Sequence, residues 1–242
     1  MSENPTGYAA VVGTFDGVHR GHRYLIDDLC RRAGQRGLAT ALFTFTDHPL
    51  STLAPDRAPR LLTTVDEKLS LLGTTGIDHI DIKPFDTIAT LTARQYIEQL
   101  STLGIRLLLI GYDNRFGSDG LTTLSQFVQA AQGTGVTIEQ AIELTTPDGL
   151  DINSSRIRRT IADGEISLAN DLLGYHYALT GTVVHGKQLG RTIGFPTANL
   201  QLPPDTRKHP VPRGVYACLA TLHNGTTHPA MVNIGHRPTV DT

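Results

Sequence analysis

Residues Tyr8–Arg36 have the sequence YAAVVGTFDGVHRGHRYLIDDLCRRAGQR, and this stretch decides the fold of the first part of the chain. Its apolar start, Tyr8–Gly13, is typical of a short buried strand. A turn that contains glycine follows over Thr14–Gly21. The next residues, His22–Arg36, have an apolar face at helical spacing, made by Leu25, Ile26 and Leu29. Strand, glycine turn and amphipathic helix in this order predict the first unit of an open α/β sheet.

The same alternation of strands and helices continues to about residue 162. Further short apolar strands are predicted over Leu38–Phe45, His79–Ile82, Arg106–Ile110 and Thr137–Ile142. Further helices are predicted over Val65–Leu72, Thr92–Leu103, Leu121–Ala131 and Ser154–Ala162. Because short apolar strands alternate with helices, we expect a parallel sheet covered on both faces.

The pattern changes after about Leu173. Strand-like runs without helical periodicity follow at Tyr177–His185, Val215–Leu222 and Ala230–Ile234, and several prolines interrupt the region between them. We therefore expect a second, β-rich architecture, with the boundary between the two near Leu173–Tyr175.

Length and composition limit the class of protein. At about 150 residues per domain, 242 residues correspond to roughly 1.6 domains. The hydrophobic share of 39% and the charged share of 18% are typical of a globular chain. The longest run of large aliphatic residues, Leu107–Ile110, is too short to span a bilayer. Met1–Tyr8 lacks a secretory signal and the two cysteines form no disulfide framework, so we expect a cytoplasmic protein. A net charge of −2 does not favour nucleic-acid binding, and the oligomeric state stays open.

The turn after the first strand is the first candidate site. A helix N-terminus at the carboxyl end of a parallel strand favours phosphate, and glycines let the backbone approach a ligand closely. His19 and His22 are three residues apart, so both can face a triphosphate and donate hydrogen bonds to it. The alternative is a tight turn with two surface histidines. The combination with a buried strand, a helix and three glycines favours the functional interpretation; the glycines are Gly13, Gly17 and Gly21.

The start of the helix at Ser154 is the second candidate site. Ser154 or Ser155 is a good N-cap, and Arg156 and Arg158 follow within the first turns. Hydroxyls, free N–H groups and guanidinium groups at one helix end can hold phosphates as a clamp. The alternative is a capped, basic helix without a ligand, and the two interpretations are equally favoured when this helix is considered alone.

Several longer motifs together resemble the bacterial bifunctional riboflavin kinase/FMN adenylyltransferases, also called prokaryotic FAD synthetases. In the first part, the motifs are Gly13-Thr-Phe-Asp-Gly-Val-His-Arg-Gly-His22, Thr44-Phe-Thr-Asp-His-Pro49, Gly111-Tyr-Asp-Asn-Arg-Phe-Gly117 and Ser154-Ser-Arg-Ile-Arg158. In the second part, they are Gly181-Thr-Val-Val-His-Gly186, Gly190-Arg-Thr-Ile-Gly-Phe-Pro-Thr-Ala-Asn199, Arg213-Gly-Val-Tyr216 and Val232-Asn-Ile-Gly235. The resemblance covers nearly the whole chain.

The resemblance implies an α/β fold with two modules. Residues 1–173 would form a Rossmann-like nucleotidylyltransferase domain, and residues 174–242 an incomplete antiparallel β-barrel like that of riboflavin kinases. The first module would convert FMN and ATP, with Mg²⁺, into FAD and pyrophosphate. Its small-molecule substrates are then ATP and FMN, with FAD as product and riboflavin as the substrate of the second module.

The resemblance also implies site residues. His19, His22 and Arg158 would be catalytic, because they bind the phosphates and stabilise charge at the α-phosphorus. The nucleotide would be bound by Gly13, Thr14, Phe15, Asp16, Gly21, Gly111, Ser154, Ser155 and Arg156. The flavin would be bound by His48, Asp113, Asn114 and Arg115. Two departures affect flavin binding: Asp47 stands where the family usually has proline, and Asn114 where it has an aromatic residue.

The second module departs further from the family. Thr197 and Asn199 correspond to the side chains that hold Mg²⁺ and ATP in riboflavin kinases, and oxygen ligands suit Mg²⁺. The family's catalytic glutamate lies beyond the Val232–Gly235 motif, whereas no glutamate follows Glu165 in these 242 residues. We therefore expect the kinase activity, which converts riboflavin and ATP into FMN and ADP, to be absent from this chain.

Two other functions remain open. The first is a nucleotidylyltransferase that acts on a different phosphorylated acceptor, such as phosphopantetheine. It would share the histidine site but would give no reason for the Phe195-Pro-Thr-Ala-Asn199 motif. The second is a flavin- or nucleotide-binding protein without turnover, which Asp47 and Asn114 suggest.

Overall fold

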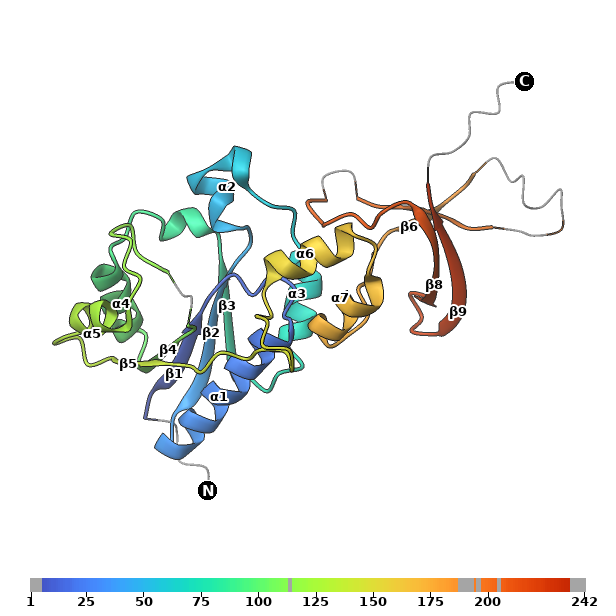
Figure 1. The fold of residues 1–242 in the computed structure, drawn as a ribbon. Helices are drawn as coiled ribbons and strands as arrows, with labels where there is room; N and C mark the ends of the chain where they lie inside the picture. Colours follow the sequence, from blue (N-terminus) through green and yellow to red (C-terminus); the bar gives the residue numbers. More distant parts are fainter. Residues whose placement is uncertain (1–5, 113–114, 187–193, 195–196, 204–205, 236–242) are drawn as a thin grey trace.

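The computed structural model describes residues 6–112, 115–186, 194, 197–203 and 206–235. Its first part is built on a five-stranded parallel sheet in the order β3-β2-β1-β4-β5 (Figure 1). The strands are β1 (Tyr8–Val12), β2 (Ala39–Phe45), β3 (His79–Lys83), β4 (Ile105–Ile110) and β5 (Thr137–Gln140). The chain runs outward from β1 to β3 and then returns to the other side of β1. In such sheets ligands bind at the carboxyl ends of the strands where the order reverses, here between β1 and β4.

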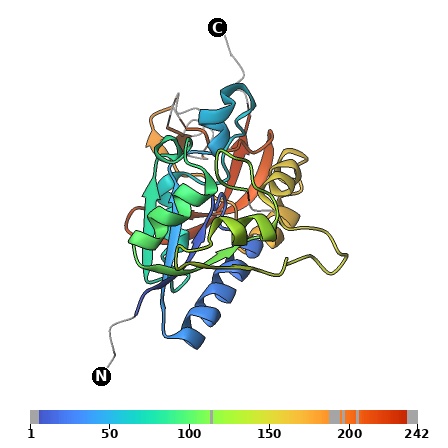
Figure 2. The same cartoon turned by 90° about the vertical axis from the view of Figure 1, so that its left-hand side faces the viewer.

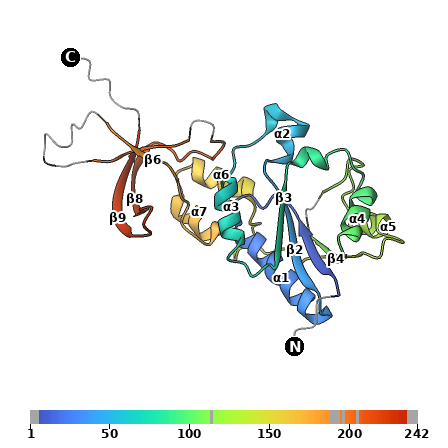
Figure 3. The ribbon, with the colours of Figure 1, turned by 180° about the vertical axis from the view of Figure 1, so that it is seen from behind.

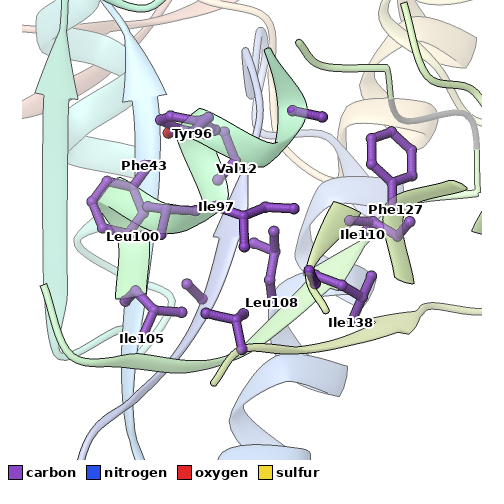
Figure 4. Packing of buried hydrophobic residues seen from close by; sticks show 14 of the residues in the cluster. Val12, Phe43, Tyr96, Ile97, Leu100, Ile105, Leu108, Ile110, Phe127 and Ile138 are labelled. Carbon is purple, nitrogen blue, oxygen red and sulfur yellow. The ribbon is translucent and has the colours of Figure 1, made fainter. Parts of the chain in front are cut away.

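Helices cover both faces of this sheet (Figure 2 and Figure 3): α1 (Arg20–Arg36) and α3 (Val65–Leu72) lie on one face, α4 (Ala93–Thr102) and α5 (Leu124–Ala130) on the other. On the first face Ile26 and Leu72 pack in one buried cluster with Val11. On the second face Ile97 and Phe127 pack in another with Leu108 (Figure 4). The side chains of successive residues in a strand point to opposite faces of the sheet, so the sheet contributes apolar side chains to a buried cluster on each face. The predicted parallel sheet with helices on both faces is confirmed.

The helix ends follow from local chemistry. Thr64 and Glu67 form a capping box at the start of α3, where each side chain accepts a hydrogen bond from the other residue's backbone N–H. The first helix begins at Arg20, two residues before the predicted start. The reason is that the side chain of His19 is the N-cap and accepts from the N–H of His22. Histidine is not one of the usual capping residues, so the sequence pattern did not indicate this start.

Several elements were not predicted. They are the helices α2 (Pro49–Leu53) and α7 (Ile166–Leu173), the single turns η1 (Pro55–Arg57) and η2 (Phe85–Thr87), and the strand β7 (Asn199–Gln201). Helix α7 packs against α6 (Ser154–Ala162) through a small apolar cluster that contains Ile157, Ile161 and Leu172. Across the part of the chain that the structure describes, no helix has the length and apolar character needed to cross a membrane.

After α7 the architecture changes to antiparallel strands. Strand β6 (Thr182–Val184) pairs with β7, and β8 (Gly214–Thr221) pairs with β9 (Thr227–Ile234). Figure 1 shows these strands extending away from the parallel sheet. Within the described residues the two pairs form separate two-stranded sheets. The predicted β-rich second part is therefore present, whereas the incomplete barrel is not confirmed. The expected strand Tyr177–His185 is also shorter, since only Thr182–Val184 pairs.

Candidate functional site

The loop after β1 and the N-terminus of α6 meet at the carboxyl end of the sheet. Together they line a cavity of about 490 Å³. Most of the predicted site residues line it, although they come from distant parts of the sequence: Gly13, Thr14, Phe15, Asp16, His19, Gly21, His22, His48, Gly111, Ser154, Ser155 and Arg158. The two candidate sites of the sequence analysis are therefore one site in space.

Two predicted residues that the structure describes, Arg156 and Arg115, do not lie in this cavity. Arg156 donates to the backbone oxygen of Asp151 at 2.9 Å and does not line the cavity. Arg115 is exposed and does not line it either. Asp113 and Asn114 lie outside the described residues.

The loop after β1 has an unusual backbone. Gly17 has a φ of 81°, and a Cβ added to it would lie 2.8 Å from Leu62 Cδ1, so both the conformation and the space require glycine. Phe15 and Val18 adopt positive φ values of 48° and 37° although they carry side chains. Such residues each store about 1–3 kcal/mol of strain and cluster at ligand sites. Gly21 serves a different purpose: a Cβ there would lie 2.9 Å from the carbonyl oxygen of Ile152, so glycine lets α1 approach the segment before α6.

The two histidines stand side by side. Their ring centroids are 3.6 Å apart and the ring planes differ by 19°. Burial, together with a smaller contribution from the charge of Arg158, lowers the pKa of His19 to about 3. Burial also lowers the pKa of His22, with smaller contributions from His19 and Lys68. Both imidazoles are therefore neutral at pH 7.

A neutral imidazole can still donate one hydrogen bond. Nδ1 of His19 accepts from the backbone N–H of His22 at 3.3 Å, so the proton of the neutral His19 ring is on Nε2. Nε2 of His19 is thus a donor. Nδ1 of His22 is buried and has no hydrogen-bond partner among the residues that the structure describes. The pair can supply polar hydrogens to an anion without carrying charge of its own.

Asp16 and Arg158 tie the two halves of the site together. Asp16 is 4% exposed, and its Oδ2 accepts from Arg158 Nη1 at 2.6 Å. Its Oδ1 accepts from the backbone N–H groups of Leu62 at 2.7 Å and Thr63 at 3.3 Å. Burial raises the pKa of Asp16, while Arg158 and these two N–H groups oppose that effect. The carboxylate is thus occupied by protein groups, and it orients the guanidinium of Arg158 at the cavity.

Lys68, which is 5% exposed, also lies at this site and was not predicted from the sequence. From α3 its ammonium donates to the carbonyl oxygen of Thr14, in the loop after β1, at 3.1 Å, and to that of Phe45, the last residue of β2. Burial lowers its pKa to about 8, while Asp16 and Asp47 oppose that effect. Lys68 places a buried cation behind the loop after β1. The sequence feature that could have indicated this role is the position of Lys68 on the buried side of the predicted helix Val65–Leu72.

The first part of the chain is an open parallel sheet. A glycine-rich loop, a neutral histidine pair and an arginine lie together where the strand order reverses. This arrangement defines a nucleotide-binding α/β protein of the nucleotidyltransferase type. The FAD synthetase family model matches residues 1–156, and the riboflavin kinase model matches residues 173–242. The chain belongs to the bifunctional riboflavin kinase/FMN adenylyltransferase family.

Individual relatives match over nearly the whole chain. The bifunctional riboflavin kinase/FMN adenylyltransferase of Escherichia coli K12 is 39% identical and covers 99% of this chain and 77% of its own length. That of Bacillus subtilis 168 is 35% identical, with 99% and 75% covered. A solved structure described as a macrolide-efflux protein from Streptococcus pneumoniae superposes with a TM-score of 0.85 at 29% identity, covering 98% of this chain and 77% of that one.

The match to the riboflavin kinase model bears on the second module. Because residues 173–242 match it, the expectation that the kinase activity is absent is not confirmed. Thr197 is exposed and precedes β7, and Asn199 is half-buried as the first residue of that strand. Both can offer oxygen atoms, and their role as Mg²⁺ ligands stays a prediction.

Proposed function

We propose that the first module transfers the adenylyl group of MgATP to FMN, which gives FAD and pyrophosphate. The observation that supports this most strongly is the shared cavity, in which the histidine pair and the start of α6 converge. The relatives of this chain are bifunctional riboflavin kinase/FMN adenylyltransferases, which supports FMN as the acceptor.

The chemistry requires little of the protein beyond placement and charge. A phosphate oxygen of FMN attacks the α-phosphorus of ATP, and the bond from that phosphorus to the bridging oxygen of pyrophosphate breaks. The attacking oxygen is already ionised at neutral pH, so no general base is needed. Catalysis then depends on in-line positioning and on donors aimed at the developing negative charge.

Each part of the site has a function in this reaction. The Nε2–H of His19 and the ring of His22 would donate to the reacting phosphates. Arg158, held by Asp16, would neutralise charge from the opposite side. Ser155 lines the cavity beside it and accepts from Arg158 Nη2 at 3.3 Å, which directs the guanidinium toward the start of α6. Mg²⁺ enters with ATP, on the phosphate oxygens of the substrate.

A comparison of acceptors tests the reaction class. Purified protein is incubated with ATP and Mg²⁺ and either FMN or phosphopantetheine, and products are separated chromatographically. We expect FAD with FMN and no adenylylated product with phosphopantetheine, because only a flavin nucleotide fits the family assignment. Turnover with phosphopantetheine alone would indicate a nucleotidylyltransferase for a different phosphorylated acceptor. Tight FMN binding without pyrophosphate release would indicate a flavin-binding protein without turnover.

We further propose that the flavin ring lies in a second cavity, which has a volume of about 170 Å³ and includes aromatic side chains in its lining. It lies between α4 and strands β2 and β3, and its lining includes Phe43, Phe45 and Tyr96. The lining residue Thr44 also donates from Oγ1 to the carbonyl oxygen of Thr14 at 3.1 Å, which joins strand β2 to the loop after β1. Flat apolar rings suit pockets of this composition.

Filling this second cavity should weaken flavin binding alone. Gln99 lines it from the exposed side of α4, so Gln99→Trp places a large ring there without disturbing buried residues. We expect the KM for FMN to rise roughly tenfold, with the KM for ATP unchanged. Glu98→Trp, one residue earlier and also exposed, is the matched control and should behave as wild type. Equal KM values for FMN in both variants would place the flavin elsewhere.

For the second module we propose the boundary at residues 173/174, directly where α7 ends and Gly174 adopts a left-handed φ of 80°. Residues 174–242 would then be the riboflavin-kinase-like part. The family-model match that begins at residue 173 supports this division.

A further inference from the structure

A short segment of the second module, Thr206–His209, is attached to the first module. Leu61 donates its N–H to the carbonyl oxygen of Arg207 at 2.7 Å, and His209 donates its N–H to that of Leu61 at 2.6 Å. These two bonds form a parallel bridge between Leu61 and Lys208. The segment therefore pairs with the backbone at Leu61 as a short parallel strand would.

Lys208 also makes a side-chain attachment at this point. It is 8% exposed, its ammonium pairs with Glu67 Oε2, and it lies 4.8 Å from the centre of the Tyr177 ring. Glu67 Oε2 also accepts the N–H of Thr64 at 3.0 Å, and Oε1 accepts from the hydroxyl of Thr180 at 3.1 Å. A buried charge is tolerated because it is paired, and removal of one partner leaves the other uncompensated.

The two attachments flank the backbone that holds Asp16. The bridge fixes residue 61, and Lys208 fixes residues 64–67 through Glu67. Between them, Leu62 and Thr63 donate their N–H groups to Asp16 Oδ1, whose other oxygen holds Arg158. Thr63 also accepts from the N–H of Gly17 at 3.2 Å through Oγ1. Hydrogen bonds and the backbone between Leu62 and Thr64 thus connect Lys208 to the cavity.

We propose that Lys208 of the second module is a positioning residue for adenylyl transfer in the first module. By pairing with Glu67 it holds the 61–67 loop, whose amides hold Asp16, which in turn orients Arg158. Lys208 does not line the cavity, so it acts through these groups and touches no substrate. This inference rests on the proposed function of the first module.

The test uses the full chain and compares Lys208→Met, Lys208→Arg, Glu67→Gln and the double variant Lys208→Met/Glu67→Gln. Lys208→Met should lower kcat for FAD formation roughly tenfold with a smaller change in the KM for FMN, because Arg158 is misplaced while the flavin cavity is intact. Lys208→Arg should restore most of this loss, because it keeps the charge. The double variant should lose less than Lys208→Met, because no unpaired carboxylate remains buried.

Thermal unfolding of each variant separates this effect from loss of fold. All rates are measured at a temperature where every variant is fully folded. Wild-type kcat in folded Lys208→Met, or equal losses in the Met and Arg variants, would overturn the proposal. If the wild-type chain forms no FAD, the proposed function fails. If the wild type forms FAD and Lys208→Met is unaffected, only this inference fails.

Discussion

Replacing His22 by alanine should lower kcat for FAD formation by about two to three orders of magnitude, the usual effect of removing one preorganised donor from a transition state. His22 lines the cavity, is neutral, and stacks on His19. Its loss removes a donor to the reacting phosphates, while the KM for ATP changes much less because the other phosphate contacts remain. Initial rates over a range of ATP concentrations give both constants.

His22 is a clearer test than its neighbour. His19 is the N-cap of α1, so His19→Ala removes a cap and a donor together. Tyr24→Ala is the control for His22→Ala, because Tyr24 is on the same helix and is 39% exposed. His22→Asn keeps a donor and should retain part of the activity. Near wild-type turnover in His22→Ala, with the fold verified by circular dichroism, would remove His22 from the catalytic site.

Replacing Asp16 by alanine should have the largest effect on stability. The change leaves the guanidinium of Arg158 and the N–H groups of Leu62 and Thr63 without their acceptor in a buried place. Breaking a buried ion pair in this way lowers the free energy of unfolding by about 3–5 kcal/mol. FAD formation should also be lost, because Arg158 is no longer held at the cavity.

Urea unfolding followed by circular dichroism measures this change. Asp16→Asn keeps an acceptor oxygen for the two N–H groups and should lose less stability than Asp16→Ala, although the charge opposite Arg158 is gone. Asp56→Ala is the control, because Asp56 is exposed in η1 and its removal should change stability little. An Asp16→Ala protein as stable as this control would show that Asp16 does not tie the loop to α6.

Local sequence features predicted most of the first module. Strands β1, β2 and β4 are short, mainly apolar runs. Thr64 and Thr92 cap their helices, and each forms a capping box with the residue three positions later. Helix α7 was missed because Glu165 makes no side-chain cap hydrogen bond at its start. Strand β7 was missed because three residues are too few for a pattern.

The site was predicted less completely than the fold. The motifs indicated Asp16 as a nucleotide-binding residue, whereas its carboxylate is occupied by Leu62, Thr63 and Arg158. These partners lie 46, 47 and 142 residues further along the chain, and such pairing cannot be deduced from spacing. The contact between Lys208 and Glu67 could not be deduced from spacing either, because the two residues belong to different modules.

The fate of the ATP phosphates tests the central proposal most directly. The protein is incubated with FMN, Mg²⁺ and ATP that is labelled either at the α- or at the γ-phosphate. Adenylyl transfer predicts that the α-label appears in FAD and that the γ-label appears only in pyrophosphate, at equal rates. Transfer of the γ-label to a flavin product, or retention of the α-label in ATP while FMN is bound, would contradict the proposed reaction.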